Sequence, residues 1–414
     1  MSPSPRLGAA IAVLAVLALA IPGPVVLLLA LALATATIVD LRSARRPPTV
    51  EVELETVLSR GVATRLIVRV ASTAGEVRVR QAVTPDLELT PSEADGTLDG
   101  VLVPRRRGRH EIPPPTVRTT GPLGLGRWDR VSGERRTLLV YPDMEHARRL
   151  AGRVRHGRFR DEGVRVSGPL GLGTEFESVR DYSPDDDVRQ VNWRATARLE
   201  RPMSNQFRVD RDRDVLCVVD AGRLMAAPLG DRTRLDAALD AVSALALVAD
   251  DLGDRCGAVA FDASVLRHLA PRRSGGKAVI KTLFDLEASG IDSDYELAFR
   301  TIASAKRAFV LVLTDLIDEA AARSLVSAVP VLARRHSVTI ATATDGELRA
   351  AVSTRPERVV DVYAASIAVE VLAARQQVAA KLTRAGAHIV EARPDSLPTA
   401  CVMAYLRSKA RALA

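Results

Sequence analysis

The N-terminal part of the chain carries a long uncharged stretch, which predicts helices in a membrane. No charged residue occurs from Leu7 to Val39. That length exceeds one bilayer span of roughly 20 residues and falls short of two full spans. Pro22-Gly23-Pro24 divides the stretch, and proline is tolerated in the first turn of a helix because no backbone donor is needed there. We therefore expect a tight hairpin of two apolar helices, each of about 15 to 18 residues.

Arginines flank the apolar stretch on both sides. Arg6 precedes it, and Arg42, Arg45 and Arg46 follow it. Because cytoplasmic flanks carry an excess of basic residues, both ends of the hairpin are expected in the cytoplasm. The predicted localisation is the cell membrane, with the remaining domains cytoplasmic. A cleaved secretory signal and a single tilted span are the alternatives that this pattern leaves open.

Alternating polar and apolar residues over 47–142 predict a small antiparallel sandwich. Short runs with period two are separated by turn residues, as in half-buried strands. The clearest runs are 49–54, 66–70, 77–80, 87–89 and 101–103.

The pattern changes to short apolar runs after residue 211. Val215–Val219 and Ala308–Leu313 are continuous apolar runs, and helical stretches cover 234–248, 320–334 and 367–385. Buried strands that alternate with helices are typical of a mainly parallel sheet covered on both faces. We therefore predict an α/β fold with a doubly wound domain over 211–414.

Composition narrows the classes of partner. Lysine occurs only five times among 58 basic residues, so arginine dominates a chain with a formal net charge of +8. Arginine suits pairing with carboxylates, phosphates or lipid headgroups. Aromatic residues make up 3%, which argues against the aromatic platforms of single-stranded nucleic-acid binders, and we expect no nucleic-acid partner. The three cysteines have no paired spacing and predict buried, reduced thiols.

A highly charged segment over 143–210 separates the two predicted domains. Within it, 173–198 places arginines beside acids, so Arg180, Arg189 and Arg194 are candidates to pair with Glu175, Asp186 and Asp187. Aromatic side chains would anchor this lattice. A clamp between domains and recognition of a partner are both open interpretations, whereas catalysis is disfavoured because 173–198 contains no histidine or cysteine. The candidate partner-binding residues are Glu175, Phe176, Arg180, Tyr182, Asp186, Asp187, Arg189, Trp193 and Arg198.

This segment resembles the bacterial family called domain of unknown function 58. The family pattern runs roughly G-x-E-F-x-S-x-R-x-Y-x-x-G-D-D-x-R-x-I-D-W-x-x-x-A-R, and residues 173–198 fill most of its positions. The N-terminal hairpin and the β-rich region containing Gly-Pro-Leu-Gly-Leu at 121–125 also look like the family. Asp185 stands at the usual glycine position and Asn192 at the usual aspartate, and the loss of that charge weakens an arginine pair there.

The resemblance implies a von Willebrand factor A-like domain after the motif, with a Mg²⁺ site at the sheet edge. In von Willebrand factor A-like domains the first strand ends in D-x-S-x-S, and the matching residues here are Asp220-Ala221-Gly222-Arg223-Leu224, which lack both serines. The later aspartate is matched by Asp315. We expect a degenerate site in which Arg223 covers Asp220 and Asp315 in place of the cation. Weak Mg²⁺ binding by the two carboxylates with water is the alternative.

The sequence therefore favours a non-enzymatic, membrane-anchored interaction or assembly protein without a cofactor. The resemblance implies a MoxR-type AAA+ ATPase as partner, because genes of this kind commonly accompany such ATPases. The alternative is a divalent-metal-dependent, adhesion-type ligand-binding module. A hydrolase would need a nucleophile and a base, and Ser178 has no partner evident from the sequence.

Overall fold

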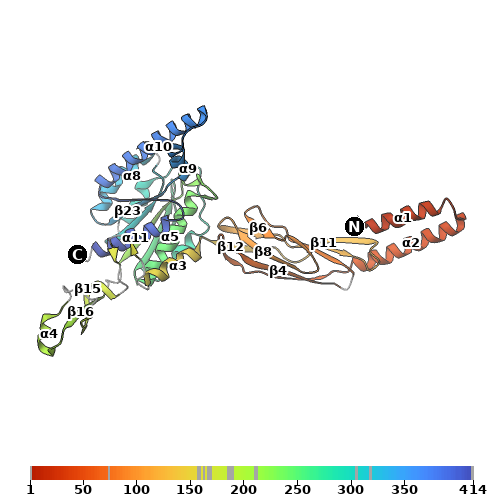
Figure 1. Ribbon diagram of the computed structural model, residues 1–414, viewed down its shortest axis with the longest axis horizontal. Coiled ribbons are helices and arrows are strands. Elements are labelled where there is room, and N and C mark those ends of the chain that lie inside the picture. The colour runs from red at the N-terminus through yellow and green to blue at the C-terminus, as the bar shows by residue number, and fades with distance from the viewer. Residues whose placement is uncertain are drawn as a thin grey trace. The chain divides into compact units, whose positions relative to one another are not determined.

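The protein is described by a computed structural model that divides into two compact units, Met1–Tyr141 and Pro142–Ala414 (Figure 1). The structure describes residues 2–72, 75–155, 160–161, 164–165, 170–183, 191–208, 213–303, 306–316 and 319–411.

The C-terminal unit is built on a six-stranded sheet with helices packed against it. The strand order is β21-β20-β17-β22-β23-β24, and the pairs are parallel except for the antiparallel edge strand β21. Its strands are β17 (Asp214–Asp220), β20 (Arg255–Phe261), β21 (Val265–Arg273), β22 (Ala308–Leu313), β23 (Ser337–Ala343) and β24 (His388–Ala392). The helices are α3 (Met144–Arg155), α5 (Arg234–Asp251), α6 (Gly276–Leu283), α7 (Tyr295–Ile302), α8 (Glu319–Ala333), α9 (Gly346–Ser353), α10 (Val359–Arg384) and α11 (Leu397–Arg411).

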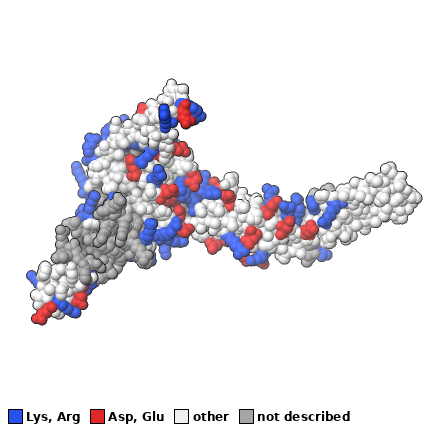
Figure 2. Space-filling view, in the orientation of Figure 1, with Lys and Arg blue, Asp and Glu red and all other residues white. Residues whose placement is uncertain are grey.

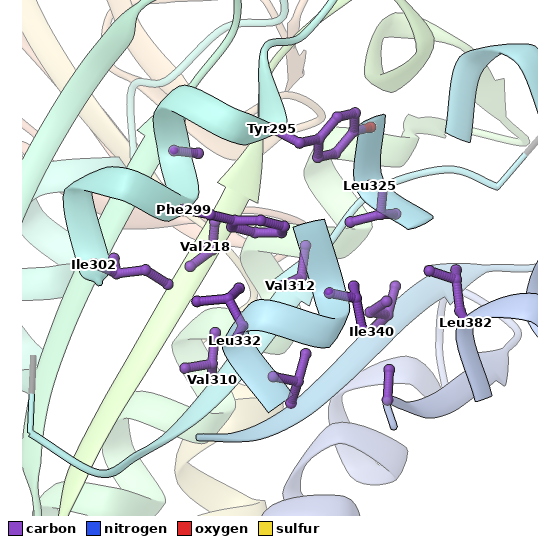
Figure 3. Packing of buried hydrophobic residues seen from close by; sticks show 14 of the residues in the cluster. Val218, Tyr295, Phe299, Ile302, Val310, Val312, Leu325, Leu332, Ile340 and Leu382 are labelled. Atoms are coloured by element: carbon purple, nitrogen blue, oxygen red, sulfur yellow. The ribbon is translucent and has the colours of Figure 1, made fainter. Parts of the chain in front are cut away.

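The central strands are apolar throughout because both of their faces are covered. All residues of β17 and β22 are buried, as expected for a parallel sheet with helices on each side. Figure 3 shows one face, where Val218 and Val310 of the sheet lie among Phe299, Leu325 and Leu332 of the covering helices. The predicted alternation of buried strands and helices therefore gives a mixed α/β unit.

The N-terminal unit is β-rich, and alternate residues of its strands form the core. In β8 (Leu98–Pro104) Leu98, Gly100 and Leu102 are buried, whereas Asp99 and Val101 between them are exposed. The sheets run β1-β11-β10-β5-β7, β2-β4-β8-β6 and β3-β12-β9. The remaining strands are β1 (Ser2–Pro3), β2 (Thr49–Glu53), β3 (Val57–Ser59), β4 (Thr64–Ala71), β5 (Val77–Arg80), β6 (Leu87–Thr90), β7 (Glu93–Asp95), β9 (Gly108–Ile112), β10 (Thr116–Thr120), β11 (Gly126–Val131) and β12 (Arg136–Tyr141).

Two apolar helices lie side by side ahead of the β-sheets. They are α1 (Pro5–Leu17) and α2 (Gly23–Ala44), and the face of this pair in Figure 2 is almost free of charged side chains. The expectation of two similar helices is wrong, because α1 has 13 residues and α2 has 22. At 1.5 Å per residue, α1 covers about 20 Å of a hydrocarbon core of about 30 Å. Within the described residues, one helix, α2, is long and apolar enough to cross a membrane.

Asp40, near the C-terminal end of α2, fixes this helix to the β-rich part of the unit. Its carboxylate is fully buried and accepts hydrogen bonds from the backbone N–H groups of Leu123 and Leu125, both at 2.7 Å, and of Gly126 at 2.8 Å. The beginning of α1 reaches the same loop, since the backbone N–H of Ser4 donates to the carbonyl of Leu125 at 3.2 Å. Both ends of the helix pair are therefore held by the loop at 121–126.

Glycines in this loop allow the close approach of α2. A Cβ at Gly121 would overlap the carboxyl group of Asp40, and a Cβ at Gly126 would lie 2.5 Å from the Leu41 side chain. Gly124 has a φ of +69°, which favours glycine. The Gly-Pro-Leu-Gly-Leu sequence thus has a packing role in joining the helix pair to the sheet.

Replacement of Asp40 by alanine will increase the rate of amide hydrogen exchange in the loop at 121–126. Three buried N–H groups lose a charged acceptor, and each such bond contributes about 1.5–3 kcal/mol. Amide hydrogen exchange over residues 121–126, followed by mass spectrometry of the full chain in detergent micelles, should accelerate by at least about tenfold.

Asp129→Ala is the matched control, because the exposed Asp129 carboxylate pairs on the surface of the same unit with Arg118 at 2.6 Å. It should leave exchange over 121–126 unchanged. Equal exchange in Asp40→Ala and wild-type protein would contradict the anchoring role of Asp40.

Candidate functional site

The two predicted metal ligands lie at the carboxyl edge of the six-stranded sheet. Asp220 is the last residue of β17, and Thr314 and Asp315 directly follow the neighbouring strand β22. From this central pair the strand order proceeds in opposite directions, towards β20 on one side and β23 on the other. In open α/β sheets such a reversal of strand order is the usual place for a ligand.

Asp220 is enclosed by hydrogen-bond donors of the protein itself. Its Oδ1 accepts from the backbone N–H of Gly222 at 2.8 Å and from the Ser293 hydroxyl. Its Oδ2 accepts from the hydroxyls of Tyr295 at 2.8 Å and Thr314 at 2.7 Å. Burial raises the pKa of Tyr295, and the nearby Asp220 carboxylate raises it further. Tyr295 therefore keeps its proton at neutral pH and donates a hydrogen bond to Asp220.

Asp315 is neutralised by two arginines instead. The Asp315 side chain is 1% exposed and lies 3.2 Å from Nε of Arg234 and 3.4 Å from Nη2 of Arg375. Thr342 donates a further hydrogen bond to Asp315 at 3.3 Å, and Arg234 also donates to the carbonyl of Ala343 at 2.9 Å. Burial raises the pKa of the Asp315 carboxyl, and both guanidiniums oppose that effect.

The predicted role of Arg223 is wrong. Its exposed guanidinium pairs with Asp292 at 2.9 Å, because the backbone after β17 turns into a short 3-10 helix, Arg223–Ala226. Hydroxyls bind Asp220, and arginines from α5 and α10 bind Asp315. A sequence signal for Arg234 exists, since Thr233 and Asp236 form the capping box of α5. That motif places Arg234 at the first position of a helix that follows β17.

The donor set at this edge does not fit a divalent cation. Mg²⁺ binds carboxylate and other hard oxygen ligands, whereas two guanidiniums occupy the Asp315 carboxylate and add positive charge. Among the described residues, no group of three or more histidine, cysteine, aspartate or glutamate side chains is arranged to hold a metal.

The cysteines are buried thiols in the sheet and its covering helix. Cys217, Cys256 and Cys401 are free and buried. Burial raises the pKa of Cys217 to about 12 and also raises the pKa values of Cys256 and Cys401. Because the thiolate is the nucleophile, none of the three is activated at neutral pH.

The charged motif, residues 173–198, lies in a β-hairpin that has a short helix just before its second strand. β15 (Leu170–Asp181) pairs antiparallel with β16 (Met203–Arg208), and α4 (Trp193–Leu199) precedes β16. Asn192 caps α4, because its side-chain oxygen accepts from the N–H of Ala195 at 2.9 Å. Its amide nitrogen donates to Asn205 at 2.7 Å. Asparagine and aspartate are equally good caps, so this departure from the family pattern preserves the helix start.

The contacts described for this hairpin differ from the predicted charge lattice. Arg180 Nη1 donates to the carbonyl of Asp181 at 3.0 Å, and the Asp181 carboxylate pairs with Arg201 at 3.3 Å, a pair that was not predicted. The register places Glu175 opposite Arg208 and Phe176 opposite Phe207. Asp185, Asp186, Asp187 and Arg189 lie outside the described residues.

Trp193 departs most clearly from expectation. It was predicted to be an apolar anchor, but it is 69% exposed at the first position of α4. Arg198 is exposed in the last turn of the same helix. Tyr182 is partly buried, and its backbone N–H donates to the carbonyl of Pro202 at 2.9 Å. The short helix α4 thus presents an aromatic and a cationic side chain to solvent.

Arg234→Gln will destabilise the α/β unit. The change removes one of the two guanidiniums from the buried Asp315, and removal of a partner from a buried ion pair usually costs about 3–5 kcal/mol. Because Arg375 remains, we expect a loss of about 2–3 kcal/mol in urea unfolding.

Arg223→Gln provides the comparison, since it breaks an exposed pair and should change stability by less than about 1 kcal/mol. A larger loss for Arg223→Gln than for Arg234→Gln would reverse the assignment of the arginine that neutralises the sheet edge.

Comparisons with known proteins agree with the motif. A family model described as "Protein of unknown function DUF58" matches residues 178–390, slightly more than half of the chain. "Uncharacterized protein Rv1480" of Mycobacterium tuberculosis is 25% identical over 167 residues, which cover 38% of this chain and 52% of that protein. "Uncharacterized protein YeaD" of Bacillus subtilis is 29% identical over 116 residues, or 28% of each chain. The chain thus spans about half or less of the length of these relatives.

Two solved structures show only weak similarity to this chain. An uncharacterized membrane spanning protein from Vibrio fischeri covers 49% of this chain and 99% of its own, at 14% identity and a TM-score of 0.16. A cohesin module from a Clostridium perfringens family 33 glycoside hydrolase covers 22% of this chain and 96% of its own, at 7% identity and the same TM-score. Scores this low carry no argument about fold. By the match of the family model over 178–390, the chain belongs to the DUF58 family of proteins of unknown function.

Proposed function

We propose that this protein is a membrane-anchored, non-enzymatic interaction or assembly protein that works with a MoxR-type AAA+ ATPase. The observation that carries the proposal is the combination of an apolar helix pair, held at both ends by one loop, with an α/β unit whose sheet-edge carboxylates are neutralised from within.

The proposed membrane anchor rests on the length and apolar composition of α2. Its 22 residues suffice for a bilayer span. Because Ser4 before α1 and Asp40 at the end of α2 bind the same loop, the chain leaves and re-enters the same side of the membrane. The basic flank at Arg42, Arg45 and Arg46 favours the cytoplasm for that side.

The α/β unit is, in this proposal, von Willebrand factor A-like. Support comes from the order β21-β20-β17-β22-β23-β24 with an antiparallel first edge strand, and from aspartates at the ends of the two central strands. Domains of this shape commonly bind partners at the carboxyl edge of the sheet, as expected from the resemblance noted above.

The carboxyl edge favours binding over catalysis. Asp220 accepts four hydrogen bonds from the protein and Asp315 pairs with two arginines. A general base must be free to accept a proton from substrate, and both carboxylates are engaged elsewhere. The buried cysteines, with raised pKa values, are likewise unsuited to nucleophilic attack.

The partner surface in this proposal is the charged motif. Tryptophan and arginine are residue types that are enriched at the energetic centres of protein interfaces. Trp193 and Arg198 are both exposed on α4. The choice of a MoxR-type ATPase comes from the family resemblance, and the acidic and basic side chains of the motif supply charges for its recognition.

Co-purification of the full chain from native membranes, with a non-hydrolysable ATP analogue present, should recover the ATPase. Trp193→Ala should reduce that recovery by at least about tenfold, because truncation of a central interface aromatic commonly costs 2 kcal/mol or more.

Tyr363→Ala is the matched control, since Tyr363 on α10 is a similarly exposed aromatic at 67%. It should leave recovery of the ATPase unchanged. Failure of the wild-type chain to recover an ATPase refutes the partner, and equal losses in both variants refute the motif as the surface.

A divalent-metal-dependent ligand-binding module is the second candidate. The observation in its favour is the set of hydroxyls, from Ser293 and Thr314, beside the Asp220 carboxylate, because these are oxygen ligands. Calorimetric titration of the full chain in micelles with Mg²⁺ and Mn²⁺ should give no saturable heat, since the nearby arginines oppose cation binding. A saturable signal that Asp220→Ala abolishes would favour this candidate over the first.

A further inference from the structure

A basic cavity lies at the amino edge of the six-stranded sheet, at the ends of the strands opposite to Asp220 and Asp315. Its volume is about 490 Å³, within the range of roughly 300–1,000 Å³ usual for small-molecule sites. The first residues of β17, β22, β23 and β24 contribute to its wall, together with the last turns of α11. Its cationic lining residues are Arg213, Lys306, Arg307, Arg407, Lys409 and Arg411.

Two charges of the lining are balanced within the protein. Lys409 Nζ lies 2.6 Å from the buried carboxylate of Asp254, and this pair joins α11 to the sheet. Asp214 is the acidic lining residue, and it lies 3.4 Å from Arg255. Lys306, Arg307 and Arg411 are exposed cations of the lining, so they can reorient towards a ligand.

Helix ends explain only a part of this charge. Cations in the last turn of α11 complement a helix dipole equivalent to about half a negative charge. Lys306 and Arg307 come instead from the segment before β22. Besides Lys409, which Asp254 balances, five cations and one acid line the cavity. The excess therefore points to an anion rather than to compensation of the dipole.

A histidine and two aromatic side chains also line the cavity. Nδ1 of His388 is buried and has no hydrogen-bond partner in the described part of the chain. Burial, together with Arg411 and Arg407, lowers the pKa of His388, which favours a neutral ring able to donate one hydrogen bond. Phe309 and Tyr405 stack edge to face, with their ring centroids 5.4 Å apart, beside these polar groups.

We propose that this cavity binds a small molecule bearing one or more phosphate groups together with an apolar or ring portion. Arginine forks and lysine match phosphate oxygens, the imidazole of His388 supplies a further donor, and the largely buried rings of Phe309 and Tyr405 form an apolar part of the wall. The site lies at the sheet edge opposite to Asp220 and Asp315 and uses none of the residues assigned to the partner surface, so it goes beyond the proposed function and does not depend on it.

The test is calorimetric titration of the full chain in zwitterionic micelles with pyrophosphate, ADP and dihexanoyl phosphatidic acid. At least one probe should bind with saturable heat. Lys306→Gln/Arg307→Gln should weaken binding by at least about tenfold, since a lost charge-assisted hydrogen bond commonly reduces affinity by that factor or more.

Lys277→Gln/Arg323→Gln is the matched control. It removes one exposed lysine and one exposed arginine of the same unit that do not line the cavity, and it should leave affinity unchanged. Binding of pyrophosphate or ADP identifies a soluble phosphate compound as the source, and binding of the lipid alone identifies a headgroup. Absence of binding by all three probes, or equal weakening in both double variants, overturns the proposal.

Discussion

The anchoring of the apolar helix pair depends on one buried carboxylate. Asp40 is placed at the end of a helix that is otherwise suited to lipid, and the three backbone N–H groups of the loop at 121–126 compensate its burial. A charge in that position would be costly without such donors. Since Ser4 binds the same loop, this interaction fixes where both helices meet the β-sheets.

The α/β unit buries two more aspartates and compensates them differently. Hydroxyl groups and one N–H surround Asp220, whereas Arg234 and Arg375 neutralise Asp315. The two solutions have different consequences for chemistry. The hydroxyl groups around Asp220 carry oxygen atoms of the kind that can bind a metal ion. The guanidiniums around Asp315 instead supply the positive charge that a metal ion would otherwise bring. The carboxylates of this edge are therefore compensated within the protein, which is compatible with the binding role proposed above.

The pattern of apolar and polar residues predicted the short strands correctly, both where every residue is buried and where buried and exposed residues alternate. Ala308–Leu313 coincides with β22, and Val77–Arg80 coincides with β5, because both are short runs bounded by turn residues. The helix predicted at 367–385 starts at Val359 in the structure. Its first turns carry valines and a tyrosine that remain exposed, so hydrophobic periodicity carries no information about where this helix begins.

The contacts of the candidate site depend on distances that sequence spacing does not encode. Arg223 is three residues from Asp220, yet it pairs with Asp292, whereas Asp315 meets Arg234 and Arg375 from two separate helices. The aromatic anchor expected at Trp193 is exposed at the first position of α4, directly after the N-cap residue Asn192. Motif spacing therefore identified the segment, and tertiary packing decided the role of each side chain.

Membrane topology, measured at both ends of the full chain, tests the central claim most directly. A compartment-sensitive reporter is fused before Met1 in one protein and after Ala414 in another. The attachment of Ser4 and Asp40 to one loop predicts the same compartment for both reporters. The arginines that follow α2 predict that this compartment is the cytoplasm. Signals from opposite compartments would contradict the hairpin, and an external signal from both ends would exclude docking of a cytoplasmic ATPase.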